Sequence, residues 1–484
     1  ATSYAGAWGG TGIGATIMTW EYNPDLDSTS APNSTGIGIT FNQKIKAGSG
    51  NITIRSGGYD GTLVENFGIG SSVTIAGNSL SFTPTSTLSY DSYYYVTLPS
   101  GVITNMAGES YVGTAYSFKV PLQTYTLWGW GNSVDQNGQL TGTPTNPTPS
   151  PTESSWGQSW VKVSGARHNL LSKNDGTLWA VGGNEYGELG QNTSSNPSNS
   201  HLSSPVQIPG TTWNATEFGA GLYINIAKKT DGTLWSWGRG AYGALGLNNT
   251  TQYSSPVQIP GTTWGEVVSQ GEGFTAIKTD GTLWVWGLNE RGQLGQNNLT
   301  NYSSPKQVGS ETTWTSLIHT GPPGIPNNGG IKTDGTLWLW GRNESGSTGY
   351  NDRVARSSPV QVPGTTWRNA SSGRGQTLAT RTDGTLWSWG ANTYGQLGIN
   401  NRTTMSSPVQ LPGTTWSIGY VGEDQAYATK TDGTIWSWGR NRYYSGGRGN
   451  AWPSGMYSSP VQVPGTWHTV MEIASEGAFA FKSS

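Results

Sequence analysis

Few residues in this sequence have the types and spacing that catalysis requires. The chain has four histidines and no cysteine among 484 residues, and no histidine pair stands at metal-ligand spacing. No glycine-rich phosphate loop followed by Lys-Ser/Thr occurs either. Glu272, or Glu423 with Asp424, would form a catalytic carboxylate pair only if the fold brought them together. We therefore expect a binding protein with no enzymatic activity, no catalytic residues, no cofactor and no metal.

The elements that position these residues repeat along the chain. The pentapeptide Asp-Gly-Thr-Leu-Trp occurs five times and returns once with Ile in place of Leu; a reduced copy reads Tyr125-Thr126-Leu127-Trp128. A period of about fifty residues is typical of propellers and solenoids. Each unit contains four strand candidates separated by turn signals, as one propeller blade requires. The Asp-Gly pair suits a tight hairpin, so we interpret these aspartates as turn formers rather than metal ligands.

The two ends of the repeat region complement each other. The chain finishes with two strand candidates, at 467–473 and 478–482, and stops where the pentapeptide should follow. The repeat region begins with a third strand at 125–131 and no strand before it. Because an open propeller would leave costly unpaired strand edges, we expect these ends to form one composite blade. Six internal blades and this one predict a closed seven-bladed β-propeller.

Tryptophan placement favours the same all-β architecture. Twenty of the 24 tryptophans fall at two recurring positions: the start of the first strand and the Leu-Trp-x-Trp segment of the third. Residues two apart, such as Trp235 and Trp237, project from one face of a strand. We expect them to pack between blades, and we prefer this interpretation to a set of sugar-binding platforms.

The residues before the repeats follow another pattern. Residues 1–16 are rich in Gly, Ala and Thr and suggest a flexible lead-in. Residues 17–121 contain short alternating segments, such as 36–41 and 93–98, that predict a β-sandwich. This stretch resembles the bacterial Ig-like domains of S-layer and other surface proteins, which usually act as spacers. The propeller would then occupy residues 122–484.

The repeats themselves resemble the regulator of chromosome condensation family. The resemblance rests on three motifs in fixed order, of which 383–390, 392–398 and 406–410 are one example. It implies a seven-bladed β-propeller. Family members include a guanine-nucleotide exchange factor and a secreted protein inhibitor of β-lactamases. The family therefore implies a fold and a tendency to bind proteins, but no particular chemistry.

A binding site is expected on one face of the ring. We number the strands of each repeat one to four. The turns between strands two and three, and the links from strand four to strand one of the next repeat, are nearly uniform. The loops between strands one and two (one–two loops) and between strands three and four (three–four loops) vary, and they fall on the opposite face. The alternative is that these loops have simply drifted. An insertion at 443–457 contains Trp452, a candidate for an exposed aromatic residue that contacts a partner. The candidate binding residues are Arg167, His168, Tyr223, Glu272, Phe274, Arg374, Gln376, Glu423, Asp424 and Trp452.

Composition narrows the class of partner. Only 11% of residues are charged and the net charge is −2, so nucleic acid is not an expected partner, and no apolar stretch is long enough to span a membrane. We expect a structural and binding protein displayed on a cell surface or virion, such as an adhesin, fibre or decoration protein. Its partner would be a protein or glycan on a host or neighbouring surface, with the N-terminal domain docking it into a larger assembly. The alternatives are a secreted enzyme inhibitor and, less favoured, a nucleotide exchange factor.

Overall fold

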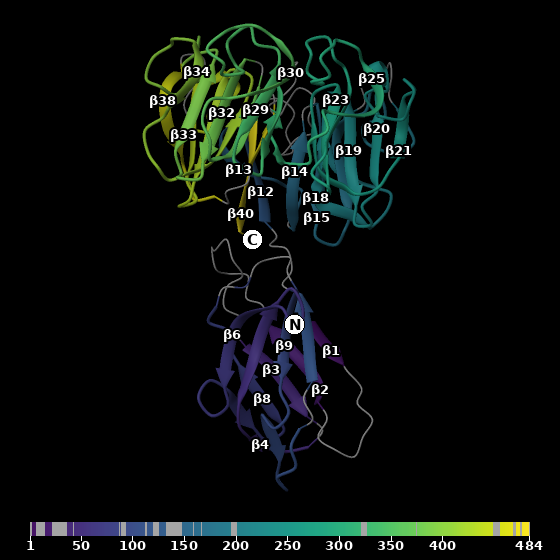
Figure 1. Ribbon diagram of the computed structural model, residues 1–484, viewed down its shortest axis with the longest axis vertical. Coiled ribbons are helices and arrows are strands. Elements are labelled where there is room, and N and C mark those ends of the chain that lie inside the picture. The colour runs from purple at the N-terminus through teal and green to yellow at the C-terminus, as the bar shows by residue number, and fades with distance from the viewer. Residues whose placement is uncertain are drawn as a thin grey trace. The chain divides into compact units, whose positions relative to one another are not determined.

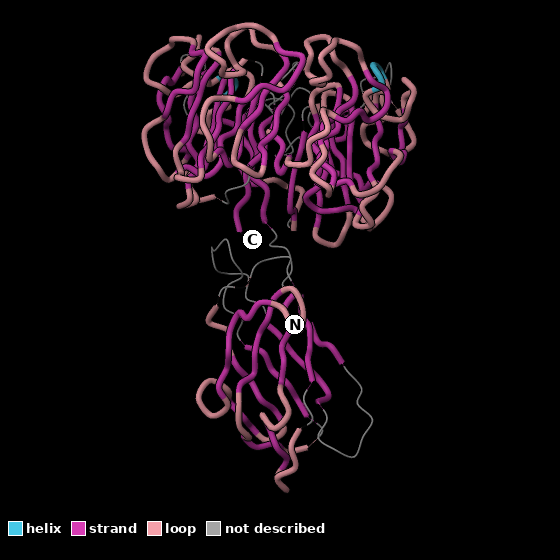
Figure 2. The backbone as a smooth tube through the Cα atoms, in the orientation of Figure 1, coloured by secondary structure: helices cyan, strands magenta, loops and turns pink. Residues whose placement is uncertain are grey.

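The computed structural model is all-β and divides into two compact units, Ala1–Thr124 with Ser483–Ser484, and Tyr125–Lys482 (Figure 1). No helix in the described part of the chain is long and apolar enough to cross a membrane. The only helical segments among the described residues are the single turns η1 (Ala241–Gly243) and η2 (Arg442–Tyr444), and Figure 2 shows strands and loops almost throughout. The structure describes all residues except 1, 6–14, 22–35, 42, 87, 89–92, 112–113, 120–124, 132–147, 158, 166, 195–200, 321–326, 374, 449–454, 468–470, 475–476 and 484.

The N-terminal unit is a β-sandwich, as predicted. In β9, alternate residues Tyr94, Val96 and Leu98 are buried, so one face of the strand meets the core. The core joins Ile39 of one sheet to Ile54 of the other. The first sheet has the order β1 (Thr2–Ala5), β2 (Ala15–Glu21), β3 (Gly36–Phe41), β8 (Ser79–Phe82) and β7 (Thr74–Ala76). The second has the order β11 (Thr114–Lys119), β9 (Tyr93–Leu98), β5 (Asn51–Ser56) and β6 (Thr62–Gly68), and β10 (Ile103–Asn105) pairs with β4 (Ile45–Ala47).

Part of the expected flexible lead-in is a strand. Residues Thr2–Ala5 form β1, which pairs antiparallel with β2 from Thr2 opposite Trp20 to Ala5 opposite Ile17. The composition of residues 1–16 did not indicate this strand. The strand forms because β2 supplies its backbone hydrogen-bond partners, and such pairing is not visible in composition. Most of the remaining lead-in lies outside the described residues.

The second unit is built from antiparallel blades of four strands, one per repeat, and the first and last blades join in one eight-stranded sheet where Tyr125 pairs with Trp160. Its six internal blades, each given from first strand to fourth, are β14 (Trp160–Gly165), β15 (His168–Lys173), β16 (Leu178–Gly183), β17 (His201–Ile208); β18 (Trp213–Ala220), β19 (Ile224–Lys229), β20 (Leu234–Gly238), β21 (Tyr253–Ile259); β22 (Trp264–Ser269), β23 (Gly273–Lys278), β24 (Leu283–Gly287), β25 (Tyr302–Gln307); β26 (Trp314–Leu317), β28 (Asn328–Lys332), β29 (Leu337–Gly341), β30 (Arg356–Gln361); β31 (Trp367–Ser372), β32 (Gln376–Arg381), β33 (Leu386–Gly390), β34 (Met405–Gln410); and β35 (Trp416–Val421), β36 (Gln425–Lys430), β37 (Ile435–Arg440), β38 (Met456–Val463). A short strand, β27 (His319–Thr320), pairs in parallel with β31. We number these blades 1 to 6.

The seventh blade is the predicted composite. Its strand order is β39 (Met471–Ala474), β40 (Gly477–Ser483), β12 (Tyr125–Gly131) and β13 (Thr148–Glu153), so both ends of the repeat region share one sheet. First strands of successive blades contact each other around the ring, from β14 through β18, β22, β26, β31 and β35 to β39 and back to β14. The indole of Trp130 donates a hydrogen bond of 2.9 Å to the carbonyl oxygen of Ser445 in blade 6. The propeller is therefore closed with seven blades.

The repeated pentapeptide has a structural role in each internal blade. In blade 2, one carboxylate oxygen of Asp231 accepts hydrogen bonds from the backbone N–H and the hydroxyl of Thr233, at 2.9 and 2.7 Å. The same hydroxyl accepts a 2.9 Å hydrogen bond from the Trp235 indole. These contacts recur at Asp175, Asp280, Asp334, Asp383 and Asp432. The aspartates are turn formers, and their hydrogen bonds fix the first tryptophan of each third strand.

Candidate functional site

The one–two and three–four loops meet on one face of the propeller. The N–H of Leu288, after the third strand of blade 3, donates to the carbonyl of Glu272 in the one–two loop of that blade, at 3.0 Å. Arg440 and Asp424 repeat this contact in blade 6 at 2.9 Å. One–two loops of neighbouring blades also touch, because the Leu222 N–H donates to the Gly271 carbonyl at 2.9 Å. We call the surface formed by these two sets of loops the loop face.

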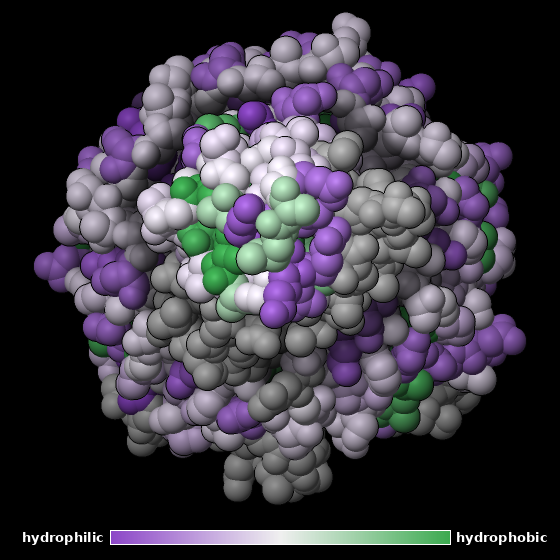
Figure 3. Space-filling model, turned by 90° about the horizontal axis from the view of Figure 1, so that it is seen from below, coloured by the Kyte–Doolittle hydropathy of each residue, from purple (hydrophilic) through white to green (hydrophobic). Residues whose placement is uncertain are grey.

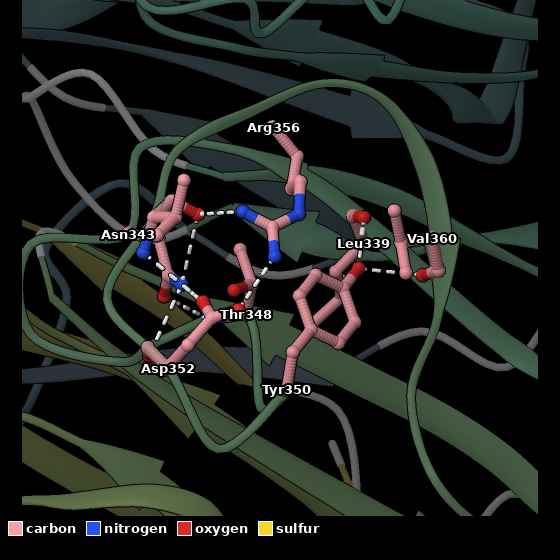
Figure 4. A network of polar contacts seen from close by, with 8 residues as sticks. Leu339, Asn343, Thr348, Tyr350, Asp352, Arg356 and Val360 are labelled. Carbon is pink, nitrogen blue, oxygen red and sulfur yellow. Dashed lines mark hydrogen bonds and ion pairs between the residues drawn. The ribbon is translucent and has the colours of Figure 1, made fainter.

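The long three–four loops are held by buried asparagines. In blade 4, the side-chain amide of Asn343 donates to the carbonyls of Asp352 and Val354, and its oxygen accepts from the Thr348 N–H at 2.9 Å (Figure 4). Arg356 adds an ion pair of 2.5 Å to Asp352. Asn289 and Asn392 close the corresponding loops of blades 3 and 5 in the same way. The three–four loops of blades 3, 4 and 5 are thus held in place by their own side chains.

Side chains from three blades converge on Arg239. Its guanidinium forms a 2.6 Å ion pair with Glu272 of blade 3 and lies 5.3 Å from the ring centre of Tyr186 in blade 1. The rings of Tyr223 and Tyr242, both in blade 2, lie 5.8 and 6.0 Å from it. These residues, with Arg167, form what we call the Arg239 cluster. The predicted residues Arg167, Tyr223 and Glu272 are therefore brought together.

The cluster is stabilised by stacked cations and rings. Arg167 lies over the Tyr223 ring at 4.9 Å, and Tyr186 meets Tyr223 edge to face at 4.9 Å. Burial raises the pKa of the Tyr223 hydroxyl and, against the opposing effect of Arg239, the pKa of the Glu272 carboxyl. These contacts between side chains orient the two guanidinium groups and the Glu272 carboxylate without a ligand.

A second, smaller group lies in blades 5 and 6. Arg440 forms an ion pair of 3.2 Å with Asp424 and lies 4.7 Å from the ring centre of Tyr394. Glu423, beside Asp424, is half-buried. Glu272 and Asp424 lie in blades 3 and 6, and each forms an ion pair with a different arginine.

Three predicted binding residues are not on the surface. His168, Phe274 and Gln376 are all buried. Each lies at or next to the start of a second strand, where side chains turn into the space between blades. His168 hydrogen-bonds Asn225 at 2.7 Å, and burial lowers its pKa to about 4. Phe274 packs against Trp286 with ring centres 5.9 Å apart, and the Gln376 amide donates to the Gln425 carbonyl at 2.8 Å.

The remaining predicted residues, Arg374 and Trp452, lie outside the described part of the chain. Within the described residues no group of three or more His, Cys, Asp or Glu side chains is arranged to hold a metal ion. Sequence reasoning missed Tyr186, Arg239 and Tyr242. All three follow the third strand of a blade. Arg239 comes directly after the Trp-x-Trp-Gly segment, and Tyr186 and Tyr242 stand a few residues further on. The residues that vary between repeats at these two positions were the available signal.

Comparison with known proteins agrees with this architecture. A family model described as RCC1-like domain matches residues 126–481, and one described as Bacterial Ig-like domain matches residues 18–120. The X-linked retinitis pigmentosa GTPase regulator of Canis lupus familiaris is 32% identical over 95 residues, 20% of this chain and 9% of that protein. The regulator of chromosome condensation of Xenopus laevis is 29% identical over 105 residues, 22% of this chain and 24% of that protein. The chain thus spans a quarter or less of the length of these relatives.

Solved structures show the same fold. Prp20p of Saccharomyces cerevisiae has a TM-score of 0.63 at 17% identity, covering 74% of this chain and 92% of its own. Human WBSCR16 has a TM-score of 0.63 at 18% identity, covering 74% and 99%. The protein is a seven-bladed β-propeller preceded by an Ig-like domain. Because the first family model matches well over half of its residues, the chain belongs to the RCC1-like domain family.

Proposed function

We propose that this chain is a non-enzymatic binding and structural protein displayed outside a cell or on a virus particle. The propeller recognises a partner through its loop face, and the Ig-like domain serves as stalk or docking module. The observation that carries the proposal is the Arg239 cluster, where blades 1 and 2 present tyrosine and arginine side chains and blade 3 adds Glu272. Tyrosine and arginine are the residue types that most often dominate binding energy at interfaces.

The N-terminal unit supports the extracellular setting. It matches a family of bacterial Ig-like domains, and its surface exposes hydrophobic side chains including Met106, which is 65% exposed, and Leu63. Figure 3 shows small groups of hydrophobic residues within a largely polar surface. A docking role for this unit would use such residues against a neighbouring subunit.

The first test is retention on surfaces. Full-length protein is incubated with intact bacterial cells and with purified virus particles, and bound protein is measured after washing. We expect saturable retention that falls at least tenfold when Arg239 and Tyr186 are both changed to Ala, because the cluster then loses its centre. The matched control is Arg440→Ala with Tyr394→Ala, which removes the equivalent pair in blades 5 and 6. Equal retention of both double variants, or no retention of the native chain, would contradict the proposal.

A second candidate, a nucleotide exchange factor, is favoured by the curated relatives, one of which is a GTPase regulator by name. It is tested by measuring release of fluorescent GDP from a panel of small GTPases in the presence of the full chain. Acceleration of release, in the absence of surface retention, would replace the first proposal with this one.

A further inference from the structure

We propose that the Arg239 cluster is a binding site for a neutral glycan, an inference that rests on the function proposed above. One tyrosine of the cluster is exposed to solvent: Tyr242 is 38% exposed. Arg239 lies 6.0 Å from the ring centre of Tyr242, so it covers that ring less closely than it covers Tyr186. The C–H face of a sugar ring stacks on such an exposed aromatic ring.

The backbone holds Tyr242 in an unusual conformation. Its φ is +60°, a left-handed value that non-glycine residues adopt at a cost of order 1 kcal/mol. Tyr186 occupies the same motif position in blade 1 and is not among the described residues with positive φ. The following residue, Gly243, lies against Ser303 of blade 3, where a Cβ would come within 2.3 Å of the serine Cα. The close packing of the neighbouring blade thus fixes the chain that presents Tyr242.

The polar groups around Tyr242 match sugar hydroxyls. Arg239 offers planar N–H donors, held in place by Glu272 at 2.6 Å, and the Glu272 carboxylate offers acceptors. Adjacent hydroxyl groups of a sugar both donate and accept, so they suit a fixed arginine–carboxylate pair. Sites of this kind use few polar groups, precisely oriented, beside an aromatic surface.

The charges of the cluster favour an uncharged ligand. Arg167 and Arg239 contribute two positive charges. Glu272 contributes one negative charge, and Glu185 and Glu290, which act electrostatically on Tyr223 and Glu272, contribute two more. An acidic polysaccharide or a phosphate group gains no net attraction here.

The test uses the full chain and immobilised neutral hexasaccharides (cello-, laminari-, manno- and chitohexaose), with a heparin hexasaccharide as the acidic probe. We expect binding to at least one neutral probe and none to heparin. Tyr242→Gly should weaken binding at least tenfold, and its melting temperature should stay close to that of the native chain, because relief of the left-handed strain offsets the lost contact of the ring with Arg239. Tyr59→Gly, which removes an exposed tyrosine of the N-terminal unit outside the loop face, should leave binding unchanged. Absence of neutral-sugar binding, preference for heparin, or an unaffected Tyr242→Gly variant would overturn the inference.

Treatment of target surfaces separates this inference from the proposed function. Periodate oxidation of the surface should abolish retention, whereas protease treatment should not. Retention that survives periodate and is lost after protease would show that the partner is a protein, which overturns the glycan inference and leaves the proposed function standing.

Discussion

Glu188 is a buried carboxyl group in the three–four loop of blade 1. It accepts a hydrogen bond from the Tyr186 N–H at 2.8 Å, and its own backbone carbonyl accepts the Trp237 indole of blade 2 at 2.8 Å. Burial raises the pKa of its side chain to about 7. Glu266, on the first strand of blade 3, has its pKa raised to about 7 for the same reason, although it accepts from the Leu317 N–H of blade 4 at 2.9 Å. The titrating carboxyl thus contacts a neighbouring blade in Glu266, whereas that of Glu188 contacts its own loop.

Between the pKa of about 4.5 in the unfolded chain and the pKa of about 7 in the folded protein, Glu188 is therefore protonated when the protein is folded and ionised when it is unfolded. The resulting stabilisation is complete below the unfolded pKa of about 4.5 and is lost as pH rises to about 7. At about 1.4 kcal/mol per pKa unit, the full effect is at most about 3 kcal/mol. We expect Glu188→Gln to gain stability relative to the native chain between pH 4.5 and 8, measured by denaturant unfolding at several pH values. The exposed Glu290→Gln is the control, and parallel stability curves for native and Glu188→Gln chains would refute this effect.

At the scale of elements, each blade contains one cation between two indoles. The Lys229 ammonium group at the end of β19 lies 4.0 Å from the ring centre of Trp235 and 5.1 Å from that of Trp213. The two rings themselves meet edge to face, with centres 6.4 Å apart. The corresponding cations of the other blades are Lys173, Lys278, Lys332, Arg381, Lys430 and Lys482. Each cation joins the tryptophan of the first strand to the first tryptophan of the third, so we interpret these tryptophans as structural clamps of the blade.

Removing one cation should measurably weaken its blade. We expect Lys229→Met, which keeps an unbranched side chain of similar length and removes the charge, to lower the free energy of unfolding by about 1–2 kcal/mol, at about 0.5–1 kcal/mol for each ring. Lys229→Arg should retain most of the stability, because blade 5 has Arg381 at this position. Denaturant titration of both variants measures the difference, and a Lys229→Met chain as stable as the native one would show that the clamps contribute only packing.

Neighbouring blades are also linked along their outer strands. The Asn248 N–H of blade 2 donates to the Ser303 carbonyl of blade 3 at 2.7 Å, and the Asn248 side chain accepts from the Ser304 hydroxyl at 3.2 Å. Equivalent links join four other neighbouring pairs through Asn192, Asn297, Asn351 and Asn400, all of which have positive φ. The repeated Ser-Ser-Pro motif therefore connects blades as well as forming an outer strand.

For the whole molecule, stability depends on the composite blade. Trp467 packs against Trp128 and Trp130, with ring centres 5.9 and 5.8 Å apart, and so joins the two ends of the repeat region. Deleting residues 465–484 would remove β39 and β40 and expose an unpaired edge of β12. We expect the truncated chain to aggregate or melt well below the native chain, as measured by light scattering and calorimetry. Adding the missing segment as a peptide should partly restore both properties, whereas a monomeric truncated chain with native melting would contradict closure by this blade.

The sequence by itself determined the Ig-like sandwich, the seven blades and the composite closure. These features follow from local signals, such as alternation within a strand and a turn at Asp231-Gly232, repeated often enough to reveal the ring. The same patterns placed Trp235 and Trp237 on one face of their strand. What the sequence left undecided was which residues of the varying loops face solvent and which meet one another.

Only the tertiary structure decided the composition of the candidate site. His168 and Phe274 stand in varying loops or at their ends, yet the neighbouring blade helps to bury them. His168 bonds Asn225, 57 residues away in sequence, and Phe274 shares a core cluster with Ile224 of blade 2. Arg239 meets Tyr186 and Glu272 because successive blades of the ring bring their loops together in space, which the repeated motif of each single loop does not show. Contacts between blades depend on three-dimensional distance, which periodicity along the chain does not encode.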